Sequence, residues 1–134
     1  MSPDRGLIDT SVVIALGRVD VARLPPDSAV STLTLAELAS GPVAARDPGE
    51  RARRQETLQR TEATFEALPF DSRCARIYAR IYAAIADAGR KPRGSRTLDL
   101  MIAATALAHE IPLYTLNAVD LRGLGDLVEI VDLG

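Results

Sequence analysis

Short apolar runs alternate with segments of helical periodicity along the whole of this 134-residue chain. The runs that predict buried strands are residues 6–9, 29–33, 68–70, 112–115 and 127–133. The segments that predict helices are residues 11–18, 34–41, 48–67, 72–88 and 97–110. Strands and helices that alternate in this way predict an α/β fold, with a central, mainly parallel sheet covered by helices on both faces.

Glycine, proline and acidic residues mark several of the expected helix ends. Gly41 and Pro42 predict the end of the helix over residues 34–41. Asp47 is expected to cap the next helix, with Pro48 at its first position and Glu50 three residues after the cap. Because that helix is charged along most of its length, we expect it to lie at the surface.

The composition is that of one folded domain over residues 1–134. Apolar residues make up 47% of the chain and charged residues 25%, and the length is sufficient to bury a core. The single cysteine, Cys74, excludes a disulfide within the chain and fits a reducing compartment such as the cytoplasm. The sequence has no run of eighteen apolar residues, so no membrane-spanning helix is expected.

The net charge of −2 gives no global sign of a nucleic-acid binder, but basic residues gather locally. Residues 90–96 contain four basic residues and no acid. Arg93 and Arg96 come shortly before an acid, Asp99. These two arginines can either contact phosphate groups or lie in a solvated loop, and the sequence leaves both interpretations open. The solvated loop is the better interpretation for Arg90 and Lys91.

Polar and acidic side chains recur where predicted strands end or the next helices begin. Asp9 ends the first strand, and Glu37 lies in the first turn of the predicted helix over residues 34–41. Asp99 lies in the first turn of the helix over residues 97–110, and Asn117 and Asp120 follow the strand before them. Since sites in open parallel sheets form beyond the carboxyl ends of the strands, these side chains are expected to converge.

Each of these residues also has a local explanation. Asp9 can cap the helix that follows it, and Asn117 can cap a short helix. Thr34 and Glu37 match a capping box. Asp99 can stabilise the positive end of a helix dipole. Taken singly, the local explanation is the stronger one for each residue, and only the set of four acids favours a site.

Four carboxylates at one edge of a sheet repel one another and raise one another's pKa. A divalent cation removes this conflict, because Mg²⁺ or Mn²⁺ prefers oxygen ligands and binds through one or two carboxylates and several waters. Such an ion polarises a phosphodiester and lowers the pKa of the attacking water. The acids therefore predict a site for Mg²⁺, which Mn²⁺ can replace.

Three segments carry a resemblance to a known family. "LIDTSVVIAL", "STLTLAELASG" and "PRGSRTLDLMIAATALAHEIPLYTLNAVDL" resemble, in order and spacing, the motifs of PIN-domain nucleases. The likeness is greatest to the VapC-type toxins of bacterial type II toxin–antitoxin modules, and it is weakest over residues 42–70. It implies a PIN-like three-layer α/β/α sandwich and a metal-dependent endoribonuclease.

The resemblance also implies roles for individual residues. Asp9 and Asp99 correspond to the direct metal ligands, and Glu37 and Asp120 correspond to acids that hold waters or a second ion. All four are therefore the expected catalytic residues. Whether one or two metal ions bind stays open.

Other positions of the resemblance concern the surroundings of the acids. Thr10 and Thr115 match hydroxyl positions beside the site, where they are expected to contact RNA. The chain has Leu121 where the family often has Phe, and it has Asn117 where some members carry an acid. These departures leave open whether Asn117 or Asp120 faces the metal, and Asn117 is a candidate for RNA contact.

The resemblance implies three partners: an RNA substrate (tRNA, rRNA or mRNA), a VapB-like antitoxin that inserts a basic side chain among the acids, and a second copy of the chain. The helix between Asp71 and Gly89 carries Ile77, Ile81 and Ile85 on one stripe, flanked by two tyrosines. This is more apolar surface than one core helix needs, so we expect the helix or its neighbour to contribute to a homodimer.

Alternative classes fit the sequence less well. A phosphatase of the Asp-x-Asp type needs an acid at position 11, where the chain has Ser11. A receiver-type signalling domain needs a lysine late in the chain, and Lys91 is the only lysine. The remaining alternative is a catalytically inactive PIN-fold module that binds RNA or protein. The four acids argue against it, because a site that only binds gains nothing from negative charges that face phosphates.

Overall fold

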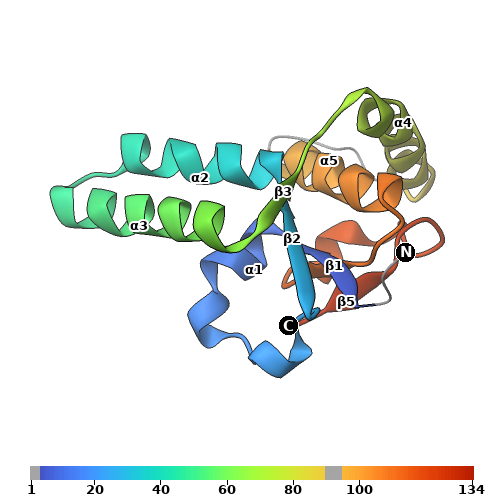
Figure 1. The fold of residues 1–134 in the computed structure, drawn as a ribbon. Helices are drawn as coiled ribbons and strands as arrows, with labels where there is room; N and C mark the ends of the chain where they lie inside the picture. The colour runs from blue at the N-terminus through green and yellow to red at the C-terminus, as the bar shows by residue number, and fades with distance from the viewer. Residues whose placement is uncertain (1–3, 90–94) are drawn as a thin grey trace.

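The computed structural model describes residues 4–89 and 95–134. Within these ranges a five-stranded sheet has the order β3-β2-β1-β4-β5, and every adjacent pair is parallel (Figure 1). The strands are β1 (Arg5–Ile8), β2 (Asp27–Ser31), β3 (Glu66–Leu68), β4 (Leu113–Thr115) and β5 (Ile130–Asp132). The predicted α/β class and parallel sheet are confirmed.

The central strands are apolar on both faces, as parallel strands covered by helices must be. Consecutive residues point to opposite faces of a sheet. Leu7 and Ala29 accordingly lie in one hydrophobic cluster, and Ile8 and Val30 lie in a second one. All four side chains are fully buried, so the sheet separates two cores.

Helices cover both faces of the sheet and form the outer layers of the sandwich (Figure 1). The cluster around Leu7 contains residues of α4 (Ser72–Asp87) and α5 (Ser95–Ala108). The cluster around Ile8 contains residues of α1 (Thr10–Ile14), α2 (Thr32–Ala44) and α3 (Pro48–Thr64). Three short 3-10 segments complete the connections that the structure describes: η1 (Leu16–Arg18), η2 (Val21–Arg23) and η3 (Ala118–Leu121).

The predicted cap of α3 is confirmed, and α4 has a cap of the same kind. Asp47 Oδ1 accepts a hydrogen bond from the Glu50 amide at 2.8 Å at the start of α3. Asp71 Oδ1 accepts one from the Cys74 amide at 3.0 Å at the start of α4, and this bond lowers the pKa of Asp71. Gly89 follows α4 with a φ of +78°, a conformation that glycine adopts without strain.

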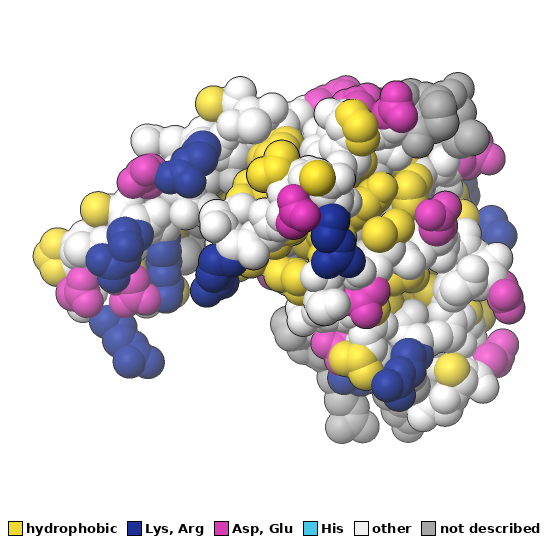
Figure 2. All heavy atoms as spheres, turned by 90° about the horizontal axis from the view of Figure 1, so that it is seen from below, with side chains coloured by type: hydrophobic (Ala, Val, Ile, Leu, Met, Phe, Trp, Pro, Cys, Tyr) yellow, Lys and Arg dark blue, Asp and Glu magenta, His cyan; other side chains and the backbone are white. Residues whose placement is uncertain are grey.

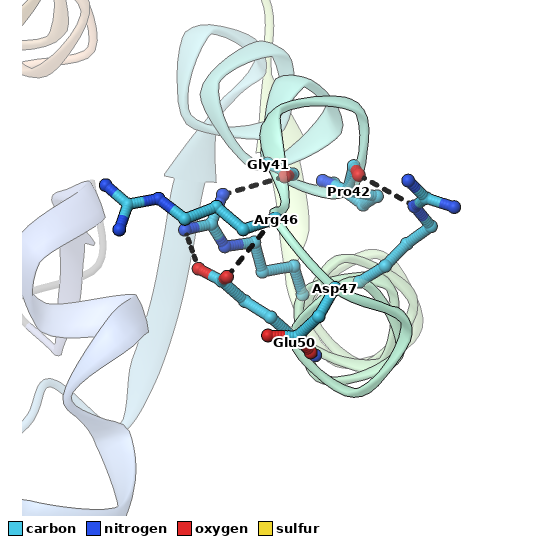
Figure 3. Close-up of polar contacts among 7 residues, drawn as sticks. Gly41, Pro42, Arg46, Asp47 and Glu50 are labelled. Carbon is cyan, nitrogen blue, oxygen red and sulfur yellow. Dashed lines mark hydrogen bonds and ion pairs between the residues drawn. The ribbon is translucent and has the colours of Figure 1, made fainter.

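The predicted end of the second helix at Gly41 and Pro42 is wrong, because α2 continues to Ala44 with Pro42 inside its last turn. Proline there removes only one amide from the helix. The backbone carbonyls at this end are bound from α3 (Figure 3): Arg54 Nη1 donates to Gly41 O at 2.9 Å, and Arg51 Nε donates to Pro42 O at 3.2 Å.

The helices α2 and α3 form a hairpin that projects from the sheet (Figure 1). Positive and negative side chains are interleaved along this projection, and no face of one sign is visible there (Figure 2). Arg54 pairs with Glu50 on α3, and the exposed Arg60 pairs with Glu56. This agrees with the expected surface helix.

The apolar stripe of α4 serves mainly the chain's own core. Ile81 and Ile85 are fully buried, and Ile77 packs against the same cluster. Ile81 and Ile85 are therefore not available for an interface between two copies, and a homodimer through the rest of this helix or its neighbour stays a prediction. Tyr82 is 47% exposed and lies beside Tyr78, with ring centroids 6.2 Å apart. In the part of the chain that the structure describes, no helix has the length and hydropathy needed to span a bilayer.

Candidate active site

Asp9 lies where β1 ends and α1 begins, and only 6% of it is exposed. Its Oδ1 accepts a hydrogen bond from the Val12 amide at 3.2 Å, so Asp9 does cap α1. The same oxygen accepts a second hydrogen bond from Ser11 Oγ at 2.5 Å. The capping role and a site role are compatible, because neither bond uses the second carboxylate oxygen, Oδ2.

Glu37 has a different place from the predicted one. Helix α2 begins at Thr32, and Ser31 caps it by accepting a hydrogen bond from the Leu33 amide at 3.0 Å. The capping box of Thr34 and Glu37 is therefore wrong, and Glu37 lies in the second turn. Its position needs an explanation other than helix capping.

The contact of Glu37 that the sequence did not reveal is with α1. Thr10 Oγ1 donates a hydrogen bond to Glu37 Oε1 at 2.5 Å, and it also lies 3.0 Å from Thr34 Oγ1. Thr34 is fully buried. The structure thus shows the Thr10 hydroxyl holding one of the acids, and contact of Thr10 with RNA stays a prediction.

Asp99 also lies deeper in its helix than predicted, in the second turn, because α5 begins at Ser95, two residues earlier than expected. The pKa of Asp99 is raised from 3.8 to about 6, first by burial and then by the negative charges of Asp9, Glu37 and Asp120. Arg96 opposes this shift. The acid that follows β1 and the acids of α2 and η3 therefore all act on Asp99 of α5, as residues of one site do.

The segment after β4 places the remaining candidates. Thr115 is fully buried, and its hydroxyl accepts a hydrogen bond from the Asn117 amide at 2.9 Å. The side chain of Asn117 is exposed. Asp120 lies in η3, and its charge acts on Asp99. These positions favour Asp120 over Asn117 as the residue that faces the metal.

Arg93 and Arg96 are the two arginines expected to contact RNA. Arg93 lies outside the described residues, so the structure bears only on Arg96. Arg96 Nη2 is 3.7 Å from Asp120 Oδ1, and the two side chains are 38% and 39% exposed. Arg96 is thus directed to an acid of the site and remains accessible to solvent.

The donor set fits a hard divalent cation. Within the described ranges, no three Asp, Glu, His or Cys side chains group closely enough to enclose a metal ion. Mg²⁺ does not require such a cage, because it keeps several waters and uses one or two carboxylates. Asp9 is buried, and Asp99 lies beside other negative charges that raise its pKa. Both carboxylates therefore suit that mode of binding.

The parallel sheet and its acidic edge define a PIN-type α/β protein, and comparison with known proteins gives the family. The PIN domain family matches residues 6–122, and the chain belongs to this family. Ribonuclease VapC5 from Mycobacterium tuberculosis is 41% identical over an alignment of 117 residues that covers 85% of this chain and 84% of that protein.

Solved structures show the same likeness. The crystal structure of VapBC-5, a member of the VapBC family of toxin–antitoxin systems from Mycobacterium tuberculosis, superposes with a TM-score of 0.80 at 37% identity and covers 97% of this chain and 99% of that one. FitAcB from Neisseria gonorrhoeae superposes with a TM-score of 0.72 at 26% identity and covers 94% of this chain and 96% of that one.

Proposed function

We propose that this PIN-domain protein is a divalent-metal-dependent endoribonuclease and that it acts as the toxin of a type II toxin–antitoxin pair. The kinship with ribonuclease VapC5 supports cleavage of RNA. The kinship with VapBC-5, a toxin–antitoxin system, supports the toxin role. We place its action in the cytoplasm, where both RNA and a reducing environment for the unpaired Cys74 are found.

One observation carries the enzymatic part of the proposal: Asp9, Glu37 and Asp120 all raise the pKa of Asp99. A chain that only binds RNA has no use for a carboxylate surrounded by three other negative charges beside a phosphate backbone. A chain that binds a cation and hydrolyses a phosphodiester does.

The residues then have distinct tasks. Asp9 and Asp99 would hold Mg²⁺ or Mn²⁺, which when bound supplies positive charge to the phosphodiester and a more acidic water. Glu37, held by Thr10, orients water at the edge of the site. Asp120 holds Arg96 where the guanidinium can meet a phosphate of the RNA.

The assembly is part of the same proposal. An antitoxin of the VapB kind would neutralise the acidic edge with a basic side chain, in place of the cation. A homodimer would use surface outside the buried part of the α4 stripe, such as the exposed Tyr82. The RNA target, whether tRNA, rRNA or mRNA, depends on surface shape.

The test uses the purified chain with a panel of total tRNA, rRNA and mRNA. We expect cleavage with Mg²⁺ or Mn²⁺, none in excess chelator, and recovery when Mg²⁺ is restored. Asp99→Asn should be inactive, while Asp20→Asn, an exposed helix-cap residue of η2, should be fully active. Cleavage that persists in chelator contradicts the metal mechanism. RNA binding without cleavage under every metal condition points to the binding module instead.

A further inference from the structure

A serine that has no role in the proposed reaction joins two parts of the acidic edge. Ser11 Oγ donates a hydrogen bond to Asp9 Oδ1 at 2.5 Å and accepts one from the backbone amide of Leu116 at 3.1 Å. Asp9 directly follows β1, and Leu116 directly follows β4, the neighbouring strand. One hydroxyl therefore bridges the ends of two adjacent strands.

The bridge arises because β1 turns into α1 at this point. The parallel ladder between the two strands reaches Asp9, whose amide donates to Tyr114 O at 3.1 Å. A ladder that continued would bring the Leu116 amide to the Asp9 carbonyl. That carbonyl accepts instead from the Val13 amide at 3.1 Å, as the first bond of α1. The Ser11 hydroxyl binds the Leu116 amide in place of the carbonyl.

This arrangement also restrains the Asp9 carboxylate. A hydroxyl that accepts a hydrogen bond is polarised and becomes a stronger donor. The Val12 amide binds the same oxygen, Oδ1, at 3.2 Å. The terminal torsion of an aspartate is otherwise broad. Two donors on one oxygen limit that torsion and keep the orientation of Oδ2 fixed.

We propose that Ser11 is a positioning residue that fixes the Asp9 carboxylate, one of the two proposed ligands of the divalent cation, relative to the segment leading from β4 to Asp120. The inference rests on the proposed metal-dependent function. Groups that hydrogen-bond a metal ligand typically contribute about 10–100-fold to metal affinity or activity. Ser11 also satisfies a backbone amide, so its test needs a measurement that a loss of structure alone does not change.

The experiment measures Mn²⁺ binding by calorimetry for the wild type, Ser11→Ala, Ser11→Thr and Ser28→Ala. Ser28 is a matched control, because its hydroxyl donates a single hydrogen bond, to Pro25 O at 2.7 Å, near the start of β2. Circular dichroism verifies that each variant is folded. We expect Ser11→Ala to weaken Mn²⁺ binding by about 10-fold or more. Ser11→Thr, which keeps a hydroxyl, should restore most of the affinity, and Ser28→Ala should leave it unchanged.

The outcomes separate the inference from the function on which it rests. If the wild type binds Mn²⁺ and folded Ser11→Ala binds it equally well, the positioning role is overturned and the metal-dependent function stands. An equal loss in Ser28→Ala also overturns it, because the effect is then one of general stability. If the wild type binds no Mn²⁺, the metal-dependent function fails and the role of Ser11 fails with it.

Discussion

Thr10 Oγ1 donates a hydrogen bond to Glu37 Oε1 across 2.5 Å, joining the first turn of α1 to the second turn of α2. Thr10→Val keeps the shape of the side chain and removes the donor. We expect cleavage to fall by about 10–100-fold, as for other groups that orient an active-site carboxylate, and Thr10→Ser to recover most of it. Thr61→Val is the control, since its hydroxyl bonds only to Thr57 O within α3. Unchanged turnover in Thr10→Val would contradict the role given to this bond.

Asp9→Asn should separate the two roles of Asp9. The amide oxygen can still accept from Ser11 and from the Val12 amide, so the free energy of unfolding should change by less than about 1 kcal/mol. Because the negative charge is lost, cleavage should fall by more than the roughly 100-fold typical of an outer-shell change. Urea unfolding and single-turnover cleavage measure the two effects. Lost stability with preserved cleavage would show that Asp9 is only a helix cap.

Stability should depend on pH through Asp99. Burial and three neighbouring carboxylates raise its pKa from 3.8 to about 6, so the folded state keeps a proton that the unfolded chain has released. The stability from this proton is present below the ordinary pKa and is lost as the pH rises through about 6. In chelator, Asp99→Asn should therefore gain stability relative to the wild type as the pH rises. Urea titrations at acidic and neutral pH measure the gain, and Asp20→Asn should show none. Added Mg²⁺ should reduce it.

Arg96→Ala tests contact with RNA. The pair with Asp120 is more than a third exposed, so its loss should cost less than about 1 kcal/mol of stability. If Arg96 binds a phosphate, the slope of log affinity against log salt should fall by about 0.7 for single-stranded RNA. The measurement is made in an Asp99→Asn background so that the RNA survives. Arg80→Ala, at an exposed position on α4, is the control. Equal slopes for the parent and Arg96→Ala would show that RNA is held elsewhere.

The hairpin of α2 and α3 allows a comparison of two arginines with the same spacing to a glutamate. Arg54 pairs with Glu50 and also binds the Gly41 carbonyl, whereas Arg60 pairs only with Glu56 at an exposed position. Arg54→Ala should lower the free energy of unfolding by about 1.5–3 kcal/mol. Arg60→Ala should lower it by no more than about 0.5 kcal/mol. Equal losses in urea unfolding would show that the carbonyl contact contributes nothing.

The sequence predicts the layers of this fold better than the starts of its helices. Alternation of strands and helices is a long-range pattern, and it predicted the parallel sheet. The start of α2 was missed because Ser31, Thr32 and Thr34 each carry a hydroxyl that can cap a helix, and only the structure shows that Ser31 does so. Pro42 predicts a helix end when only its neighbours in sequence are considered. The arginines that bind the last turn of α2 come from the next helix, α3, and local sequence does not reveal them.

The sequence likewise predicts some features of the candidate site and misses others. The rule that sites form beyond parallel strand ends selects Asp9, Glu37, Asp99 and Asp120 as candidates from eighteen acids, and the structure shows that the other three act electrostatically on Asp99. It gave no role to Ser11, although a hydroxyl in the first turn after a strand-end acid was a signal for one. Nor does it predict the bond from Thr10 to Glu37, because that bond depends on how two helices pack.

The strand order also bears on synthesis of the chain. Asp9 directly follows β1, but the neighbouring strand β4 is made about a hundred residues later, and Asp99 and Asp120 flank it. Domains on the ribosome fold as their residues emerge. The acidic edge cannot be complete while β4 is still inside the exit tunnel, so the proposed metal site can form only after β4 and Asp120 have emerged from the ribosome.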